Sequence, residues 1–114
     1  MRIGVDFGGT FIKAALVEEA NVRAHASVPT NAEAGPEAVL DSLAAAVRQL
    51  GAKAETVGVA IPGEVDDQGI CYRLPNVPGF GNYPMRRQLE TRLGCRVSIE
   101  NDATAAALAE RLFG

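Results

Sequence analysis

Three β-strand patterns follow one another directly at the start of the chain, and the helical patterns come only after them. Residues 3–7 and 11–17 are apolar runs joined by Gly-Gly-Thr at 8–10, which predicts a tight hairpin. Residues 22–28 alternate strictly between apolar and polar side chains, which is typical of a strand with one solvent-exposed face. Strands joined by connections this short pair antiparallel, because a parallel pair needs a long crossover.

The remainder of the chain alternates between helices and strands. The expected elements are a helix over 36–50, a buried strand over 57–61, a helix over 84–93, a strand over 97–99 and an alanine-rich helix that continues to residue 112. Crossovers through helices are right-handed and return to the same sheet. The pattern therefore predicts an α/β fold with a mixed five-stranded sheet flanked by helices.

Two charged segments have plain structural interpretations. Residues 64–70 are expected to form a small hairpin whose carboxylates belong to its turn, although three clustered carboxylates also suggest a cation site. On the helix over 84–93, Arg86, Arg87 and Arg92 lie off the apolar stripe. We interpret these arginines as a solvated face, with phosphate binding as the second possibility.

Composition excludes several classes of function. The 114 residues suit a single domain, and 11 Lys and Arg against 14 Asp and Glu give a net charge of −3, which predicts no nucleic-acid partner. The longest uncharged stretch, residues 74–85, contains three prolines, so no membrane span or membrane partner is expected. With no signal-peptide pattern before the first strand, the expected location is cytoplasmic. A single histidine and two cysteines leave carboxylates and backbone amides as the expected chemistry.

The glycine turn at 8–10 is the first candidate site, because ligands gather at the carboxyl ends of parallel strands. Gly8 and Gly9 lack side-chain bulk, so their amides can approach a phosphate, and Thr10 adds a hydroxyl donor. Asp6 offers an anionic ligand for Mg²⁺. The same glycines also fit a plain hairpin, and Lys13 either reaches the phosphate or extends from the sheet into solvent.

A second candidate follows the last strand. Asn101 and Asp102 either cap the next helix or place Asp102 as a general base that accepts the proton of an attacking hydroxyl, with Asn101 holding a neighbouring hydroxyl. Asn76 lies in a proline-rich loop over 75–80. Its amide suits hydrogen bonding to a polyol, and the segment equally suits an ordinary turn.

Taken together, four segments resemble the amino-terminal lobe of the ROK family of sugar kinases, in order and over essentially the whole chain. They read Val-Asp-Phe-Gly-Gly-Thr at 5–10, Ile-Pro-Gly at 61–63, Leu-Pro-Asn-Val-Pro-Gly at 74–79 and Ile-Glu-Asn-Asp-Ala-Thr-Ala-Ala-Ala-Leu-Ala-Glu at 99–110. The resemblance implies an actin-like ATPase (ribonuclease H-like) lobe. It also implies transfer of the terminal phosphoryl group of ATP to a hexose, typically glucose-like and at the 6-hydroxyl.

The resemblance also implies roles for individual residues. It assigns the catalytic base to Asp102 and a place near Mg²⁺ and the phosphates to Asp6. It assigns phosphate or nucleotide contacts to Gly8, Gly9, Thr10 and Lys13, and sugar contacts to Gly63, Asn76 and Asn101. Two positions depart from the family pattern, namely Phe11, where Lys or Asn is frequent, and Thr104, where Asn is frequent.

The family's second lobe, with its nucleotide-binding glycine motif and its zinc site, has no counterpart in this sequence. We therefore expect residues 1–114 to be a single amino-terminal lobe, inactive alone and completed by the missing lobe or by a homo-oligomer. The expected cofactors are ATP and Mg²⁺. Two alternatives remain. One is a sugar-sensing ROK regulator, although such proteins carry a helix-turn-helix domain ahead of the first strand, and the other is a non-catalytic interaction module.

Overall fold

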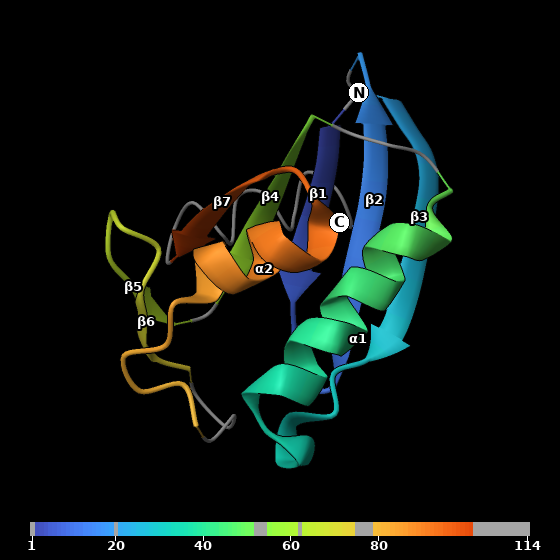
Figure 1. The fold of residues 1–114 in the computed structure, drawn as a ribbon. Coiled ribbons are helices and arrows are strands. Elements are labelled where there is room, and N and C mark those ends of the chain that lie inside the picture. Colours follow the sequence, from blue (N-terminus) through green and yellow to red (C-terminus); the bar gives the residue numbers. More distant parts are fainter. Residues whose placement is uncertain (1, 20, 52–54, 62, 75–78, 102–114) are drawn as a thin grey trace.

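The computed structural model describes residues 2–19, 21–51, 55–61, 63–74 and 79–101 of the chain. Its main element is a five-stranded sheet in the order β3-β2-β1-β4-β7 (Figure 1). The strands are β1 (Arg2–Phe7), β2 (Phe11–Glu18), β3 (Asn21–Pro29), β4 (Thr56–Ile61) and β7 (Arg96–Asn101). The predicted mixed sheet is therefore confirmed.

The pairing within the sheet follows the predicted division of the chain. β1, β2 and β3 form an antiparallel meander, and β1 pairs parallel with β4, which pairs parallel with β7. Residues 57–61 of β4 are buried apart from the partly buried Gly58, as expected for a central strand. In the outer strand β3 the predicted alternation is found over residues 24–28, where His25 is exposed and Val28 is buried. Val22 departs from it, because this side chain is exposed next to a register shift between β2 and β3.

Two helices cover one face of the sheet. These are α1 (Pro36–Gln49) and α2 (Met85–Leu93), which lie on the same side of the strands (Figure 1). A short 3₁₀ turn, η1 (Ala32–Ala34), leads from β3 into α1. The helix expected over 103–112 lies outside the described residues.

The core lies between this sheet face and the two helices. Val5, Ile12 and Val59 from the strands meet Leu43 of α1 and Leu89 of α2, and all five side chains are fully buried. Because successive strand residues point to opposite faces, Asp6 of β1 points away from these helices when Val5 and Phe7 point toward them. The face opposite the helices therefore carries the polar side chains that concern the site.

The predicted hairpin after β4 consists of β5 (Glu64–Val65) and β6 (Cys71–Arg73), paired antiparallel. Asp66 organises its turn, since its carboxylate accepts hydrogen bonds from the N–H groups of Gln68 at 2.9 Å and Ile70 at 3.0 Å and from the Tyr72 hydroxyl at 2.8 Å. The bond from Ile70, followed by that from Tyr72, lowers the pKa of the Asp66 carboxyl. The turn interpretation thus accounts for this carboxylate.

In the described part of the chain, no helix has the length and apolar character needed to cross a membrane.

Candidate functional site

The carboxyl ends of β1, β4 and β7 lie next to one another at one edge of the sheet. In the parallel register Asp6 is opposite Ala60, Ala60 is opposite Glu100, and Ile61 is opposite Asn101. Adjacent strands are about 4.8 Å apart, so β1 and β7 are separated by about 10 Å. The glycine turn that follows β1 and the last residue of β7 are therefore brought to the same edge, with one strand between them.

The turn at this edge requires a glycine at position 8. The Gly8 N–H donates to the Phe11 carbonyl at 3.0 Å, and a Cβ on Gly8 would lie 2.5 Å from that same oxygen. Gly9 and Thr10 are exposed, and a Cβ on Gly9 would have no heavy atom within 4 Å. The fold itself therefore accounts for Gly8, whereas no described atom of the protein restricts the residue at Gly9.

Thr30 forms hydrogen bonds to this turn from the protein interior, a contact that no sequence pattern predicts. It follows β3, it is fully buried, and it is the one polar or charged side chain among the described residues that is buried. Its hydroxyl donates to the Gly8 carbonyl at 2.7 Å, and its N–H donates to the Thr10 carbonyl at 2.9 Å. A threonine after a proline has no local signature of such a role, because both partners are about twenty residues earlier in the chain.

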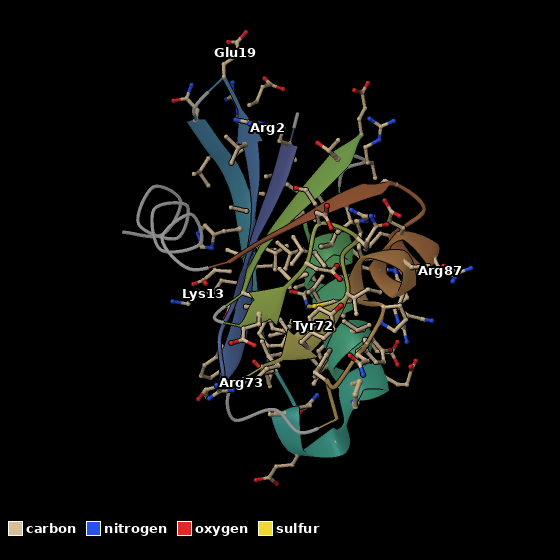
Figure 2. All side chains as sticks on the ribbon, turned by 90° about the vertical axis from the view of Figure 1, so that its left-hand side faces the viewer. Arg2, Lys13, Glu19, Tyr72, Arg73 and Arg87 are labelled. Carbon is tan, nitrogen blue, oxygen red and sulfur yellow. The ribbon has the colours of Figure 1, made fainter. Side chains whose placement is uncertain are left out.

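Asp6 and Lys13 lie on the sheet face that is turned away from α1 and α2. They are directly opposite one another across β1 and β2, so their Cβ atoms are about 5 Å apart. Asp6 is half-buried and Lys13 is exposed, and Lys13 extends from the side of the sheet opposite Arg87 of α2 (Figure 2). Within the described residues neither side chain forms an ion pair, so both charges are available beside the glycine turn.

Gly63 follows β4 at the same edge and is buried. A Cβ there would lie 2.3 Å from the Arg73 carbonyl oxygen and 3.0 Å from Cδ1 of Leu74. The contact with β6 thus demands glycine independently of any ligand. Its predicted contact with sugar stays a prediction.

The remaining predicted residues are only partly covered by the structure. Asn101 ends β7, and its backbone pairing with Ile61 is described. Asp102 and Asn76, predicted as the base and as a sugar contact, lie outside the described residues. The structure therefore brings together Asp6, Gly8, Gly9, Thr10 and Lys13 and the backbone of Asn101.

A hydrogen-bonded network joins α1 to the segment that precedes α2. The Tyr83 hydroxyl donates to Glu37 at 2.6 Å, and its ring packs edge-to-face on Phe80 with 5.1 Å between centroids. Arg92 donates to Glu37 and, at 3.0 Å, to Asp41. Burial and then the bond to Glu37 raise the pKa of Tyr83 to about 12, and the bonds from Tyr83 and then Arg92 lower the pKa of Glu37.

The expectation that Arg92 belongs to a solvated face is wrong. Its side chain is 16% exposed and is paired with two carboxylates of α1. Those carboxylates are more than fifty positions earlier in the chain, so the helical spacing of α2 could not reveal them. Arg87 is exposed, as expected.

The strand order, the parallel β1-β4-β7 half and the glycine turn after β1 define an actin-like ATPase fold, which is also the fold of solved ROK kinases that are similar to this chain. The model of the ROK family matches residues 2–114, so the chain belongs to the ROK family.

Curated sugar kinases are among the relatives to which the chain is similar. The glucokinase of Streptomyces coelicolor is 40% identical over 118 residues, which cover 100% of this chain and 36% of that protein. The chain thus spans about a third of the length of this curated relative.

Two solved structures are similar to the chain at the level of the fold and the sequence. A ROK family glucokinase from Streptomyces griseus, solved with glucose and AMPPNP, is 37% identical with a TM-score of 0.84 and covers 99% of this chain and 36% of its own. The inorganic polyphosphate/ATP-glucomannokinase of Arthrobacter sp. strain KM is 36% identical with a TM-score of 0.82, covering 98% of this chain and 48% of its own.

Proposed function

We propose that this chain is the amino-terminal lobe of a hexose kinase that transfers the terminal phosphoryl group of ATP to the 6-hydroxyl of a glucose-like sugar. The observation that carries the proposal is the register of β1, β4 and β7, which brings the glycine turn and the end of β7 to one edge. Relatives that are named as glucokinases support the choice of sugar and of reaction.

Asp102, the residue after Asn101, acts in this proposal as the general base. It accepts the proton of the sugar hydroxyl while that oxygen bonds to the terminal phosphorus of ATP, the bond from phosphorus to the bridging oxygen breaks, and ADP leaves. The ends of β1 and β7 are about 10 Å apart at the same edge of the sheet, a distance that three successive contacts of about 3 Å can span. Gly63, Asn76 and Asn101 hold the sugar.

The glycine turn holds the phosphates of the donor. Gly9 and Thr10 are exposed at the turn, and the fold imposes no side-chain clash at Gly9, so a phosphate oxygen can approach the backbone closely. The half-buried Asp6 carboxylate, free of ion pairs with other described residues, suits Mg²⁺, which prefers oxygen ligands. When bound, Mg²⁺ neutralises the charge that develops on the phosphates. Lys13 adds a cation on the same face.

The phosphate donor is ATP in this proposal, although the same turn also suits polyphosphate. Both donors present chains of phosphate oxygens, and backbone amides do not distinguish between them. The likeness to a glucokinase solved with AMPPNP favours ATP, whereas the likeness to a polyphosphate/ATP-glucomannokinase keeps polyphosphate as a second donor to be tested.

The other half of the site comes from a second lobe in our proposal, in the same polypeptide or in a partner chain. Phosphoryl transfer depends on positioning and on exclusion of water, and one edge of one sheet supplies neither completely. We therefore expect residues 1–114 alone to bind ligands weakly and to show no turnover. A kinase that uses ATP on a hexose fits a cytoplasmic location.

The test is a hybrid kinase in which residues 1–114 are continued by the remaining two thirds of the Streptomyces coelicolor glucokinase. We expect glucose-dependent release of ADP from Mg·ATP and a product phosphorylated at oxygen 6, identified by ³¹P and ¹³C NMR. The carboxyl-terminal part of the relative, expressed alone, is the control and should be inactive. A hybrid that binds glucose and Mg·ATP in calorimetry yet forms no sugar phosphate would contradict the proposal. Glucose binding without ATP binding would favour a sugar-sensing regulator.

A further inference from the structure

We propose that Thr30 is a positioning residue for phosphate binding, which acts by fixing the orientation of the Gly8–Gly9 peptide group. The inference rests on the proposed function, since it concerns the same glycine turn. Thr30 lies 22 positions after Gly8, and it touches the turn from the protein interior rather than from the side open to solvent.

Two hydrogen bonds from Thr30 fix both ends of the turn. The hydroxyl donates to the Gly8 carbonyl at 2.7 Å and the backbone N–H donates to the Thr10 carbonyl at 2.9 Å. A third bond, from the Gly8 N–H to the Phe11 carbonyl at 3.0 Å, closes the turn itself. Since Thr30 is fully buried, its hydroxyl cannot be replaced by water without rearrangement, and removing the hydroxyl leaves the partly buried Gly8 carbonyl without its partner in the protein.

Because the Gly8–Gly9 peptide group is planar, fixing its carbonyl also fixes the direction of its N–H. The Gly8–Gly9 peptide is trans, so its planar unit directs the Gly8 carbonyl and the Gly9 N–H to opposite sides. The carbonyl points to the buried Thr30 hydroxyl, and the Gly9 N–H therefore points away from the interior. In the described part of the chain this N–H donates to no protein acceptor, and Gly9 itself is exposed. An outward-facing amide in a glycine turn is a donor suited to a phosphate oxygen.

Two variants of Thr30 separate positioning from simple packing. Thr30→Val keeps the shape and burial of the side chain and removes the hydroxyl, whereas Thr30→Ser keeps the hydroxyl and removes only a methyl group. The probe is Mg·AMPPNP, added to the ¹⁵N-labelled chain while the amide resonances of Gly8, Gly9 and Thr10 are followed by NMR. We expect these resonances to shift in the native chain and in Thr30→Ser, with dissociation constants within about threefold of each other. In Thr30→Val we expect the dissociation constant to rise by about tenfold or more, the factor that corresponds to losing one hydrogen bond to a charged group.

The outcomes distinguish the inference from the proposed function. If the native chain responds at the turn and Thr30→Val binds Mg·AMPPNP equally well, the role of Thr30 is wrong and the phosphate-binding role of the turn stands. If neither the native chain nor the hybrid kinase, which supplies the second lobe, responds at the turn to Mg·AMPPNP, the phosphate role itself fails, and with it the basis of the proposed function.

Amide hydrogen exchange in the native chain tests the same inference without any substitution, should Thr30→Val fail to fold. The Gly9 N–H should exchange as fast as an unprotected glycine amide, and the Gly8 N–H, bonded to the Phe11 carbonyl, should be protected. A protected Gly9 N–H would overturn the inference, because that group would then already have a partner in the protein.

Discussion

The Tyr83 hydroxyl donates a 2.6 Å hydrogen bond to Oε1 of Glu37, a residue 46 positions earlier in the chain. The bond joins the first turn of α1 to the segment that precedes α2. Arg92 of α2 donates to the other carboxylate oxygen of Glu37, so one carboxylate receives two donors from the second half of the chain. Phe80, packed against the Tyr83 ring, is buried.

We expect Tyr83→Phe to lower the melting temperature by a few degrees, because it removes the hydroxyl and retains the ring contact with Phe80. Tyr72→Phe is the matched control, since Tyr72 is exposed and bonds only within its own hairpin, to Asp66. Thermal unfolding followed by circular dichroism gives the comparison. A Tyr72→Phe variant that is destabilised more than Tyr83→Phe would contradict the assignment of Tyr83 to a long-range contact.

The two tyrosines of the chain allow a direct test of the raised pKa at Tyr83. Burial and the bond to Glu37 raise the pKa of Tyr83 to about 12 from an ordinary value of 10. A raised pKa means that the contribution of neutral Tyr83 to stability is complete below pH 10 and is lost as the pH rises toward 12. We expect near-ultraviolet absorbance to show a tyrosine transition near pH 12 that disappears in Tyr83→Phe. A single transition near pH 10 in the native chain would contradict the structure.

For Glu37 we expect the opposite pH dependence of stability, with a loss at acid pH. Its pKa is lowered from 4.5 by the hydrogen bonds from Tyr83 and then Arg92, so the ionised carboxylate stabilises the folded state above pH 4.5 and this contribution is lost as the pH falls through the lowered value. We expect the native chain to exceed Glu37→Gln in stability at neutral pH, with the difference shrinking below pH 4.5. Denaturant unfolding of both proteins at several pH values measures this difference in the free energy of unfolding. The comparison cancels the contribution of Asp66, whose carboxyl pKa is also lowered.

Alanine substitutions at the adjacent Gly8 and Gly9 should have different effects on stability and on ATP binding. Gly8→Ala places a Cβ 2.5 Å from the Phe11 carbonyl oxygen, so we expect a destabilised chain. Gly9→Ala meets nothing within 4 Å, so we expect nearly unchanged stability and, in the hybrid kinase, a KM for ATP raised about tenfold with the KM for glucose within about twofold. Steady-state kinetics of both variants give the KM values, and thermal unfolding gives their stability. If Gly9→Ala leaves the KM for ATP unchanged, the phosphate does not approach that residue.

Periodicity was sufficient to predict the sheet and both described helices, because each pattern is local. Alternation identified β3, the continuous apolar run identified β4, and Pro36 and Gly94 marked a helix start and a helix end. Strand ends and the resemblance select the residues of the site, and the register of β1, β4 and β7 brings Asp6 and the backbone of Asn101 to one edge, whereas Asn76 and Asp102 lie outside the described residues.

The sequence failed where a side chain finds its partner far along the chain. The spacing of α2 predicts only a polar position for Arg92, yet Arg92 binds two carboxylates of α1. No local pattern predicts the contact of Thr30, because its partners lie in the first hairpin. Gly63 is also constrained by the Arg73 carbonyl oxygen, a contact that its place after β4 does not reveal. Such pairings depend on the tertiary packing, which local spacing does not encode.

The most direct test of the central claim is the kinetics of Asp102→Asn in the hybrid kinase, measured together with glucose binding by calorimetry. If the carboxylate after β7 and the glycine turn after β1 serve one phosphoryl transfer, turnover should fall by at least about a hundredfold, because a general base is lost while the side chain keeps its size. The dissociation constant for glucose should stay within about tenfold of the unsubstituted hybrid. Turnover that persists at the original rate would contradict the account.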